Sequence, residues 1–162
     1  GEVPRLRAPA VEPRGDAAPD AALPIHEMPG HLVRRLQQVA VALFTEELAG
    51  LELTPVQFAA LVALDERPGL DQATLAALIG YDRATIGGVI DRLEQKGRVR
   101  RDPHPSDRRA KVPRITAEGR AMLREAAPGV RRVQARLMAP LSPAERRTFD
   151  ALCRKLLSTH HG

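Results

Sequence analysis

The segment from Asp71 to Gly97 most constrains the fold, because it predicts two short helices joined by a turn of about two residues. Asp71 and Asp82 each precede an apolar helical pattern and can act as N-caps, since a carboxylate there accepts hydrogen bonds from free N–H groups. Gly80 stands where a helix ends in the left-handed region. The inward residues predicted are Leu75 and Leu78 in the first helix and Ile86, Val89, Ile90 and Leu93 in the second. The segment therefore predicts a tight helix-turn-helix.

A β-hairpin is predicted directly after this unit, because the hydrophobic period changes beyond Gly97. The runs 98–101 and 111–115 are compatible with β-strands, and 102–109 between them holds turn-forming and charged residues. Pro113 has no N–H to donate, so at least one strand lies at an edge. The two runs predict an antiparallel hairpin with a basic tip.

Helices are predicted on both sides of this unit. An apolar stripe predicts an amphipathic helix over 31–51, and the capping box Thr54-Pro55-Val56-Gln57 begins a second helix that reaches about Arg67. Thr116 begins a long helix that Pro128-Gly129 should kink, and Ser142 begins the last helix. Its predicted buried side holds Phe149, Leu152, Cys153, Leu156 and Leu157. The fold class is therefore mainly α with a small β-hairpin wing, as a winged helix-turn-helix within an α-helical frame.

Positive charge is concentrated in one segment of the chain. Residues 83–114 hold 10 basic and 4 acidic residues, a net charge of +6, whereas the whole chain carries +5, so the remainder is at −1. Such a segment is typical of a polyanion partner, because Lys and Arg release the counterions condensed on phosphates. Double-stranded DNA is the partner predicted.

The predicted DNA contacts lie on the second helix of the motif and on the wing. In a winged helix-turn-helix, that helix enters the major groove and the wing reaches the backbone or the minor groove. The candidate residues are Arg83, Thr85, Gly88 and Arg92 on the helix, and Asp107, Arg108 and Arg109 on the wing. Two adjacent glycines, Gly87 and Gly88, fit either a close approach of the backbone to DNA or close helix packing.

Several of these motifs together resemble the MarR family of bacterial transcriptional regulators, over residues 31 to about 158. The motifs are Leu53-Thr54-Pro55-Val56-Gln57-Phe58, Asp82-Arg83-Ala84-Thr85, Asp91-Arg92-Leu93-Glu94 with Lys96-Gly97, Asp107-Arg108-Arg109, and Ile115-Thr116-Ala117-Glu118-Gly119. The resemblance implies an obligate homodimer on a palindromic operator, with the first, fifth and sixth helices interleaved. It also implies that Arg109 enters the minor groove while Asp107 orients it. The pair Gly87-Gly88 departs from the residues of many members.

This interpretation divides the chain into four parts. Residues 1–24 form a flexible Pro/Ala-rich arm, in which Arg5, Arg7 and Arg14 are offset by acidic residues and a linker is favoured over a DNA-binding arm. Residues 25–52 form an N-terminal dimerisation helix, 53–115 the winged helix-turn-helix lobe, and 116–162 the C-terminal dimerisation helices.

A small anionic aromatic effector is the second partner that the resemblance implies, since many members bind one in a cleft beside the dimerisation helices and then release DNA. The candidate residues here are Met28, His31, Arg34 and Arg35, because Arg can fork a carboxylate beside apolar side chains. This segment is similar to regulators of aromatic-acid and hydroxynicotinate catabolism. The alternative is that Arg34 and Arg35 bind no ligand and only solvate an exposed helix face. We therefore expect a repressor of aromatic-compound catabolism, with an effector and no cofactor.

Other functions are less favoured by the sequence. A thiol-oxidation sensor would need a reactive cysteine, whereas the single Cys153 lies on an apolar stripe and is expected to be a buried structural thiol. A constitutive regulator and a nonspecific architectural DNA-binding protein are further alternatives. His26 and His31 are five residues apart, which disfavours a metal site, and no phosphate loop or nucleophile motif indicates an enzyme. No apolar run predicts a membrane span or secretion signal, so a cytoplasmic location is expected.

Overall fold

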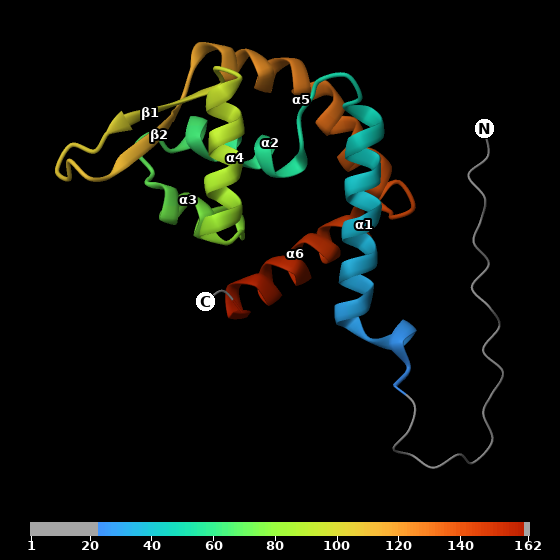
Figure 1. The fold of residues 1–162 in the computed structure, drawn as a ribbon. Coiled ribbons are helices and arrows are strands. Elements are labelled where there is room, and N and C mark those ends of the chain that lie inside the picture. Colours follow the sequence, from blue (N-terminus) through green and yellow to red (C-terminus); the bar gives the residue numbers. More distant parts are fainter. Residues whose placement is uncertain (1–22, 161–162) are drawn as a thin grey trace, which may run out of the picture.

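The structure, a computed structural model, describes residues 23–160 and confirms the predicted fold class (Figure 1). The predicted flexible arm at 1–24 lies, apart from its last two residues, outside the described residues. None of the described helices has both the length and the apolar content needed to span a membrane. The elements are a 3₁₀ turn η1 (Ile25–Glu27), α1 (Pro29–Glu47), α2 (Pro55–Glu66), α3 (Gln72–Ile79), α4 (Arg83–Gln95), β1 (Val99–Pro103), β2 (Lys111–Ile115), α5 (Ala117–Met138) and α6 (Pro143–His160).

The predicted helix caps are present. Thr54 and Gln57 form the reciprocal capping box of α2, with both backbone N–H to side-chain oxygen distances at 3.2 Å. Asp71 accepts from the N–H of Thr74 at the start of α3. Thr116 and Ser142 cap α5 and α6 in the same way. Local hydrogen bonding therefore fixes where these helices begin.

The helix-turn-helix forms as predicted, and the hairpin forms with β1 reaching Pro103, two residues beyond the predicted strand. Gly80 ends α3 at φ 78° in the left-handed region, and α4 begins after Tyr81 and Asp82. The strands β1 and β2 pair antiparallel with Val99 opposite Ile115, so Pro113 lies opposite Arg101 in a sheet of two edge strands. Figure 1 shows this hairpin projecting from the lobe beside α4.

The core is mainly aliphatic and extends from the buried side of α4 to the end of α1 and to α5. The four α4 residues predicted to point inward are buried, together with Leu61 and Leu75. The prediction for Leu78 is wrong, because this side chain is 45% exposed. At about 100° per residue, Leu75, Ile79 and Ala76 span one arc of about 100°, and Leu78 falls outside it. The buried face of α3 is therefore completed by the small Ala76.

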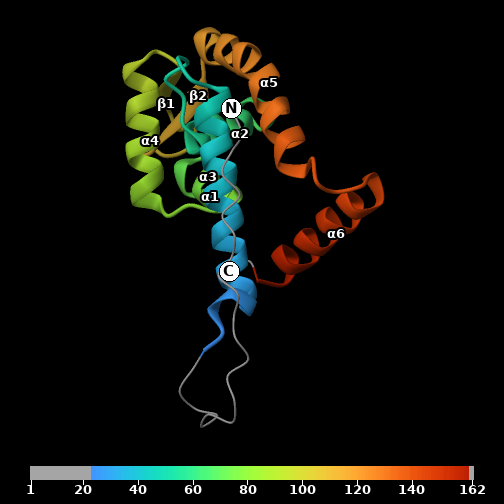
Figure 2. The ribbon, with the colours of Figure 1, turned by 90° about the vertical axis from the view of Figure 1, so that its right-hand side faces the viewer.

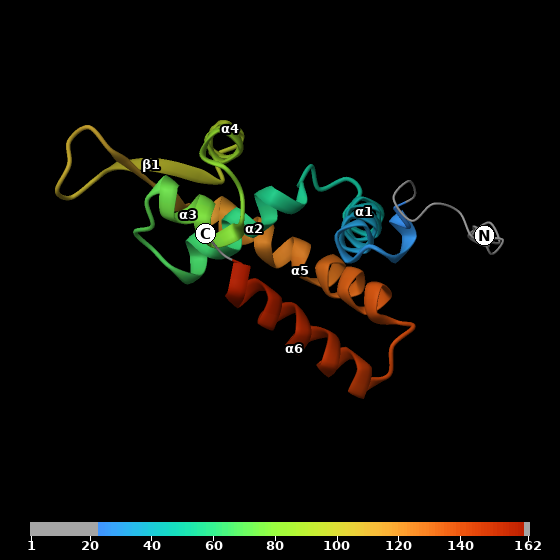
Figure 3. The same cartoon turned by 90° about the horizontal axis from the view of Figure 1, so that it is seen from below.

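The apolar sides of α1 and α6 are not covered within this chain. Leu32, Leu36 and Val39 of α1 are 47–48% exposed. The predicted burial of the α6 stripe is wrong for the single chain, since no residue of α6 is buried and Leu152 and Leu156 are more than half exposed. Leu157 is likewise exposed, Phe149 and Cys153 are only partly buried, and the expectation of a buried thiol therefore fails here. The physical reason is visible in Figure 3, where α6 stands apart from the lobe.

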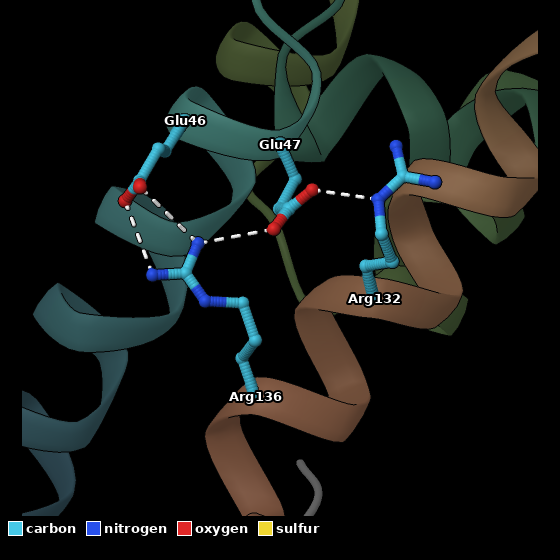
Figure 4. Close-up of polar contacts among 4 residues, drawn as sticks. All are labelled: Glu46, Glu47, Arg132 and Arg136. Atoms are coloured by element: carbon cyan, nitrogen blue, oxygen red, sulfur yellow. Dashed lines mark hydrogen bonds and ion pairs between the residues drawn. The ribbon is translucent and has the colours of Figure 1, made fainter.

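The end of α1 packs closely against α5. At Gly129 an added Cβ would overlap the Leu48 side chain, so the two backbones approach closely. Glu47 forms ion pairs with Arg132 at 2.7 Å and Arg136 at 3.1 Å (Figure 4), and the hydrogen bond from Arg132 lowers the pKa of Glu47. The helix α5 continues through Pro128, and Figure 2 shows it bending along its length. We call this contact of Glu47 and Leu48 with α5 the α1–α5 junction.

Candidate nucleic-acid interface and ligand cleft

The predicted DNA-contacting residues of α4 lie together on its exposed side. Arg83, Thr85 and Arg92 are exposed, and Gly88 is partly exposed. The rotation of α4 is fixed because Ile86, Val89, Ile90 and Leu93 are buried on the opposite side, each at 3% exposure or less. The amphipathic pattern of the helix therefore places one polar face outward, with a cation near each end.

Thr85 has a second role that the sequence prediction did not include. Its backbone N–H donates to Asp82 Oδ1 at 2.7 Å, and its hydroxyl donates to Asp82 Oδ2 at 2.8 Å. These bonds lower the pKa of the Asp82 carboxyl, the backbone bond most of all. In this structure the Thr85 hydroxyl proton serves the N-cap of α4, which leaves the oxygen lone pairs and the methyl group for a ligand.

The two glycines of α4 have different surroundings. A Cβ added to Gly87 would lie 3.3 Å from Nε2 of Gln72 in α3, whereas one added to Gly88 would meet nothing within 4 Å. Close helix packing therefore does not require a glycine at position 88. The open space in front of Gly88 favours the other interpretation, an approach of the backbone to an external partner.

Arg101 connects the wing to α4 and was missed by the sequence prediction. Its Nη1 lies 2.7 Å from Asp91 Oδ1 and 3.2 Å from Glu94 Oε1, and its side chain is 20% exposed. Its backbone N–H also donates to Glu94. In the sequence, the only sign of this contact is that Asp91 and Glu94 are three residues apart and therefore lie on the same side of α4. It fixes the wing relative to α4.

The wing tip presents Arg108 and Arg109 to solvent. Asp107 Oδ1 accepts a hydrogen bond from the backbone N–H of Arg109 at 2.9 Å. The expectation that this carboxylate holds the Arg109 guanidinium is therefore not met in the described structure. Asp107 shapes the turn instead, because a short carboxylate reaches the amide two residues on more readily than the end of a long side chain.

An apolar cleft of about 170 Å³ lies where α1, α2 and α5 meet. It is lined by Gln37, Ala40, Val41, Phe44, Pro55, Phe58, Val130, Val133 and Gln134. The predicted ligand-binding residues Met28, His31, Arg34 and Arg35 do not line it, and they lie nearer the beginning of α1. Arg34 is nevertheless three residues before Gln37, on the same side of α1 and one turn away. A continuation of this helix face would have identified Gln37, Val41 and Phe44.

The predicted ligand-binding residues are near one another at the beginning of α1. Arg34 Nη2 lies 3.4 Å from His31 Nδ1, and the rings of His26 and His31 stand edge to face with centroids 5.8 Å apart. Desolvation and the neighbouring Arg34 lower the pKa of His31. Arg34 and Arg35 are exposed, so their guanidinium groups are accessible to an anion. Within residues 23–160, no three His, Cys, Asp or Glu side chains cluster as a metal site.

Comparison with known proteins places this geometry among transcriptional regulators. A model of the MarR family matches residues 53–111. The HTH-type transcriptional repressor NicR of Pseudomonas putida is 33% identical over 135 residues, covering 83% of this chain and 85% of NicR. BpsR of Bordetella bronchiseptica, whose DNA binding is regulated by 6-hydroxynicotinic acid, is 32% identical with a TM-score of 0.79, covering 84% of this chain and 97% of that one. A transcriptional repressor CouR, solved on a 23-mer DNA duplex, is 32% identical with a TM-score of 0.76, covering 82% of this chain and 94% of that one.

Proposed function

Because the chain belongs to the MarR family of transcriptional regulators, we propose that it is a homodimeric repressor released from a palindromic operator by a small aromatic carboxylate. The observation that carries this proposal is that the polar side of α4 and the basic wing tip are both exposed on the same lobe. An apolar cleft lies where α2 of this lobe meets α1 and α5. The regulated genes would serve the breakdown of aromatic compounds.

DNA binding is supported by the shape and charge of the lobe. The exposed face of α4 is suited to base edges in the major groove, and Arg108 and Arg109 on the wing are suited to the adjacent backbone and minor groove. The DNA-bound CouR structure shares this fold. Titration with unrelated competitor DNA distinguishes a repressor from an architectural protein, because only a repressor keeps a preference of about 10³ or more for its own site.

We expect a homodimer because the exposed apolar sides of α1 and α6 need a cover. Leucines and valines half exposed along a helix stabilise a protein only when they are buried, at about 25 cal/mol per Å² of apolar surface. Light scattering should therefore give about 35.4 kDa, twice the chain mass of 17.7 kDa. A mass of one chain at micromolar concentration would contradict the proposed assembly.

An aromatic carboxylate is the effector class that the α1 residues and the cleft support. A flat ring is suited to an apolar cleft lined by Phe44 and Phe58, which contact each other with ring centroids 6.2 Å apart. A carboxylate on that ring would bind the Arg34 or Arg35 guanidinium toward the beginning of α1. One relative points to this chemistry, since the DNA binding of BpsR is regulated by 6-hydroxynicotinic acid, and a second, PcaV of Streptomyces coelicolor, was solved with a natural ligand.

The α1–α5 junction suggests how an effector releases DNA. Ion pairs and a close backbone approach fix two walls of the cleft to each other. A ligand inserted there therefore displaces the third wall, α2, which carries the helix-turn-helix. In a dimer, this displacement changes the separation of the two α4 helices from the ~34–36 Å of one DNA turn. Couplings of this kind are typically about 1–3 kcal/mol.

Replacement of Arg34 by alanine should weaken the effector response without weakening operator binding, and Arg35→Ala should act in the same direction. Loss of a charge-assisted hydrogen bond costs about 1.5–3 kcal/mol, so the effector concentration for half release should rise about 10- to 100-fold. Fluorescence anisotropy of labelled operator DNA measures both quantities. Arg124→Ala, an exposed change on α5, is the matched control. If both α1 variants respond like the wild type, the carboxylate contact is wrongly placed.

A further inference from the structure

The loop at the wing tip, from His104 to Ala110, is shaped by side chains because it lies beyond the paired strands. The backbone N–H of His104 donates to the carbonyl of Ala110 at 3.1 Å, and the N–H of Ala110 donates to the carbonyl of Asp107 at 3.2 Å. Pro103 and Pro105 on either side of His104 have no N–H. The other hydrogen bonds within this loop are made by the side chains of His104 and Asp107.

His104 accepts hydrogen bonds from two backbone N–H groups of this loop through one ring nitrogen. The N–H of Ser106 lies 3.1 Å from Nδ1, the N–H of Asp107 lies 3.2 Å from it, and the Ser106 hydroxyl is also at 3.2 Å. Asp and Asn side chains usually accept from the amides two and three residues on in such turns. A ring nitrogen can replace them only when it carries no proton.

We propose that His104 is a positioning residue for DNA binding, whose unprotonated Nδ1 holds the wing turn, and that protonation of the ring opens this turn and weakens binding. We call the bonds from Ser106 and Asp107 to Nδ1 the His104 clasp. The inference rests on the proposed contact between the wing and DNA, because the clasp acts by presenting Arg108 and Arg109. An imidazolium N–H in place of the lone pair would face two amide N–H groups without an acceptor.

The charged groups around the ring give the protonated form another partner. Asp107, Arg108 and Arg109 come from the same loop, and Lys111 begins β2 beside it. Asp71, the N-cap of α3, interacts electrostatically with His104 and Arg83, although the backbone bond from Thr74 is the largest cause of its lowered pKa. The Asp71 carboxylate attracts an imidazolium, so it gives the protonated ring a partner outside the loop.

The sign of the pH response separates this clasp from a simple surface charge. The clasp is intact while the ring is neutral and is lost when acid protonates the ring. Loss of one or two hydrogen bonds of ordinary strength weakens binding about fivefold to tenfold. A histidine that is only a surface cation has the opposite effect, since added positive charge near phosphates strengthens binding in acid.

The test compares operator affinity at about pH 8 and about pH 5.5 at constant ionic strength, because imidazole side chains gain charge between neutral and mildly acidic pH. The wild type should lose about fivefold to tenfold in acid, whereas His104→Asn, whose amide oxygen accepts at both pH values, should lose much less. His104→Ala should bind weakly at both. His160→Asn at the end of α6 is the control and should follow the wild type. Equal pH responses of wild type and His104→Asn, or tighter wild-type binding in acid, would overturn the inference.

Amide hydrogen exchange in the free protein tests the clasp independently of DNA. Protection of the Ser106 and Asp107 N–H groups should fall between about pH 8 and pH 5.5 in the wild type and stay constant in His104→Asn. Unchanged wild-type protection would refute the clasp even if DNA binding were pH dependent. Failure of every variant to bind DNA at about pH 8 would instead refute the proposed function, and the exchange data would still decide the clasp.

Discussion

Replacement of Arg109 by alanine should weaken operator binding about 10- to 100-fold and leave the fold and the oligomeric state unchanged. The side chain is exposed at the wing tip and makes no hydrogen bond or ion pair within the described residues, so its removal costs the folded protein little. An arginine in a narrow minor groove meets enhanced negative potential, and a contact of this kind is worth about 1–3 kcal/mol. Anisotropy titration gives the affinity, and circular dichroism gives the fold.

Two controls make the Arg109 result specific to the wing. Arg124→Ala removes an exposed cation of α5 that is not among the proposed DNA contacts. It should change operator affinity less than twofold, because salt screens the interaction of a distant exposed charge with DNA. The salt dependence of Arg109→Ala should also become shallower by about one phosphate contact. Equal operator affinity of Arg109→Ala and wild type would show that the wing does not contact DNA there.

Replacement of Gly119 by alanine should destabilise the protein by about 1–3 kcal/mol or more, because it forces a shift of backbone. An added Cβ would overlap the carbonyl oxygen of Arg98 and the side chain of Ile115, where the first turn of α5 crosses the base of the wing. The same turn is tied down by the Thr116 hydroxyl, which donates to the carbonyl of Gly97 at 2.6 Å. Denaturant unfolding at fixed protein concentration measures the loss.

Gly88→Ala is the matched comparison for Gly119→Ala. Nothing lies within 4 Å of the Cβ it would add, and alanine is favoured over glycine inside a helix by about 0.5–1 kcal/mol. The free energy of unfolding should therefore rise, whereas operator affinity should fall if the α4 backbone approaches DNA at this position. Equal destabilisation by the two changes would contradict the packing described for Gly119.

The features predictable from sequence were those encoded by neighbouring residues. Helix starts at Thr54, Asp71 and Asp82 depend on a cap and an amide three residues later, so their sequence spacing is sufficient. The inward face of α4 was equally readable, because four apolar residues recur at helical spacing. The hairpin followed from the change of period and from the turn residues between the two runs.

Features set by distant contacts were not predictable in this way. The α1 and α6 patterns are amphipathic, but periodicity does not say whether a partner within the chain or a second chain covers the apolar side. Leu78 was misplaced because the small Ala76 replaces it in the core. The bond of Asp107 to a backbone amide and the acceptor role of His104 depend on loop geometry. The cleft residues come from three helices that only the tertiary fold brings together.

The most direct test is an anisotropy titration of the purified protein on DNA from upstream of its own gene, repeated with a panel of aromatic and heteroaromatic carboxylates. We predict tight, competitor-resistant binding of a dimer, and release by at least one compound with an affinity change of about 5- to 150-fold. Binding that unrelated DNA competes away equally would contradict a sequence-specific repressor. Specific binding that no carboxylate relieves would contradict the proposed effector class.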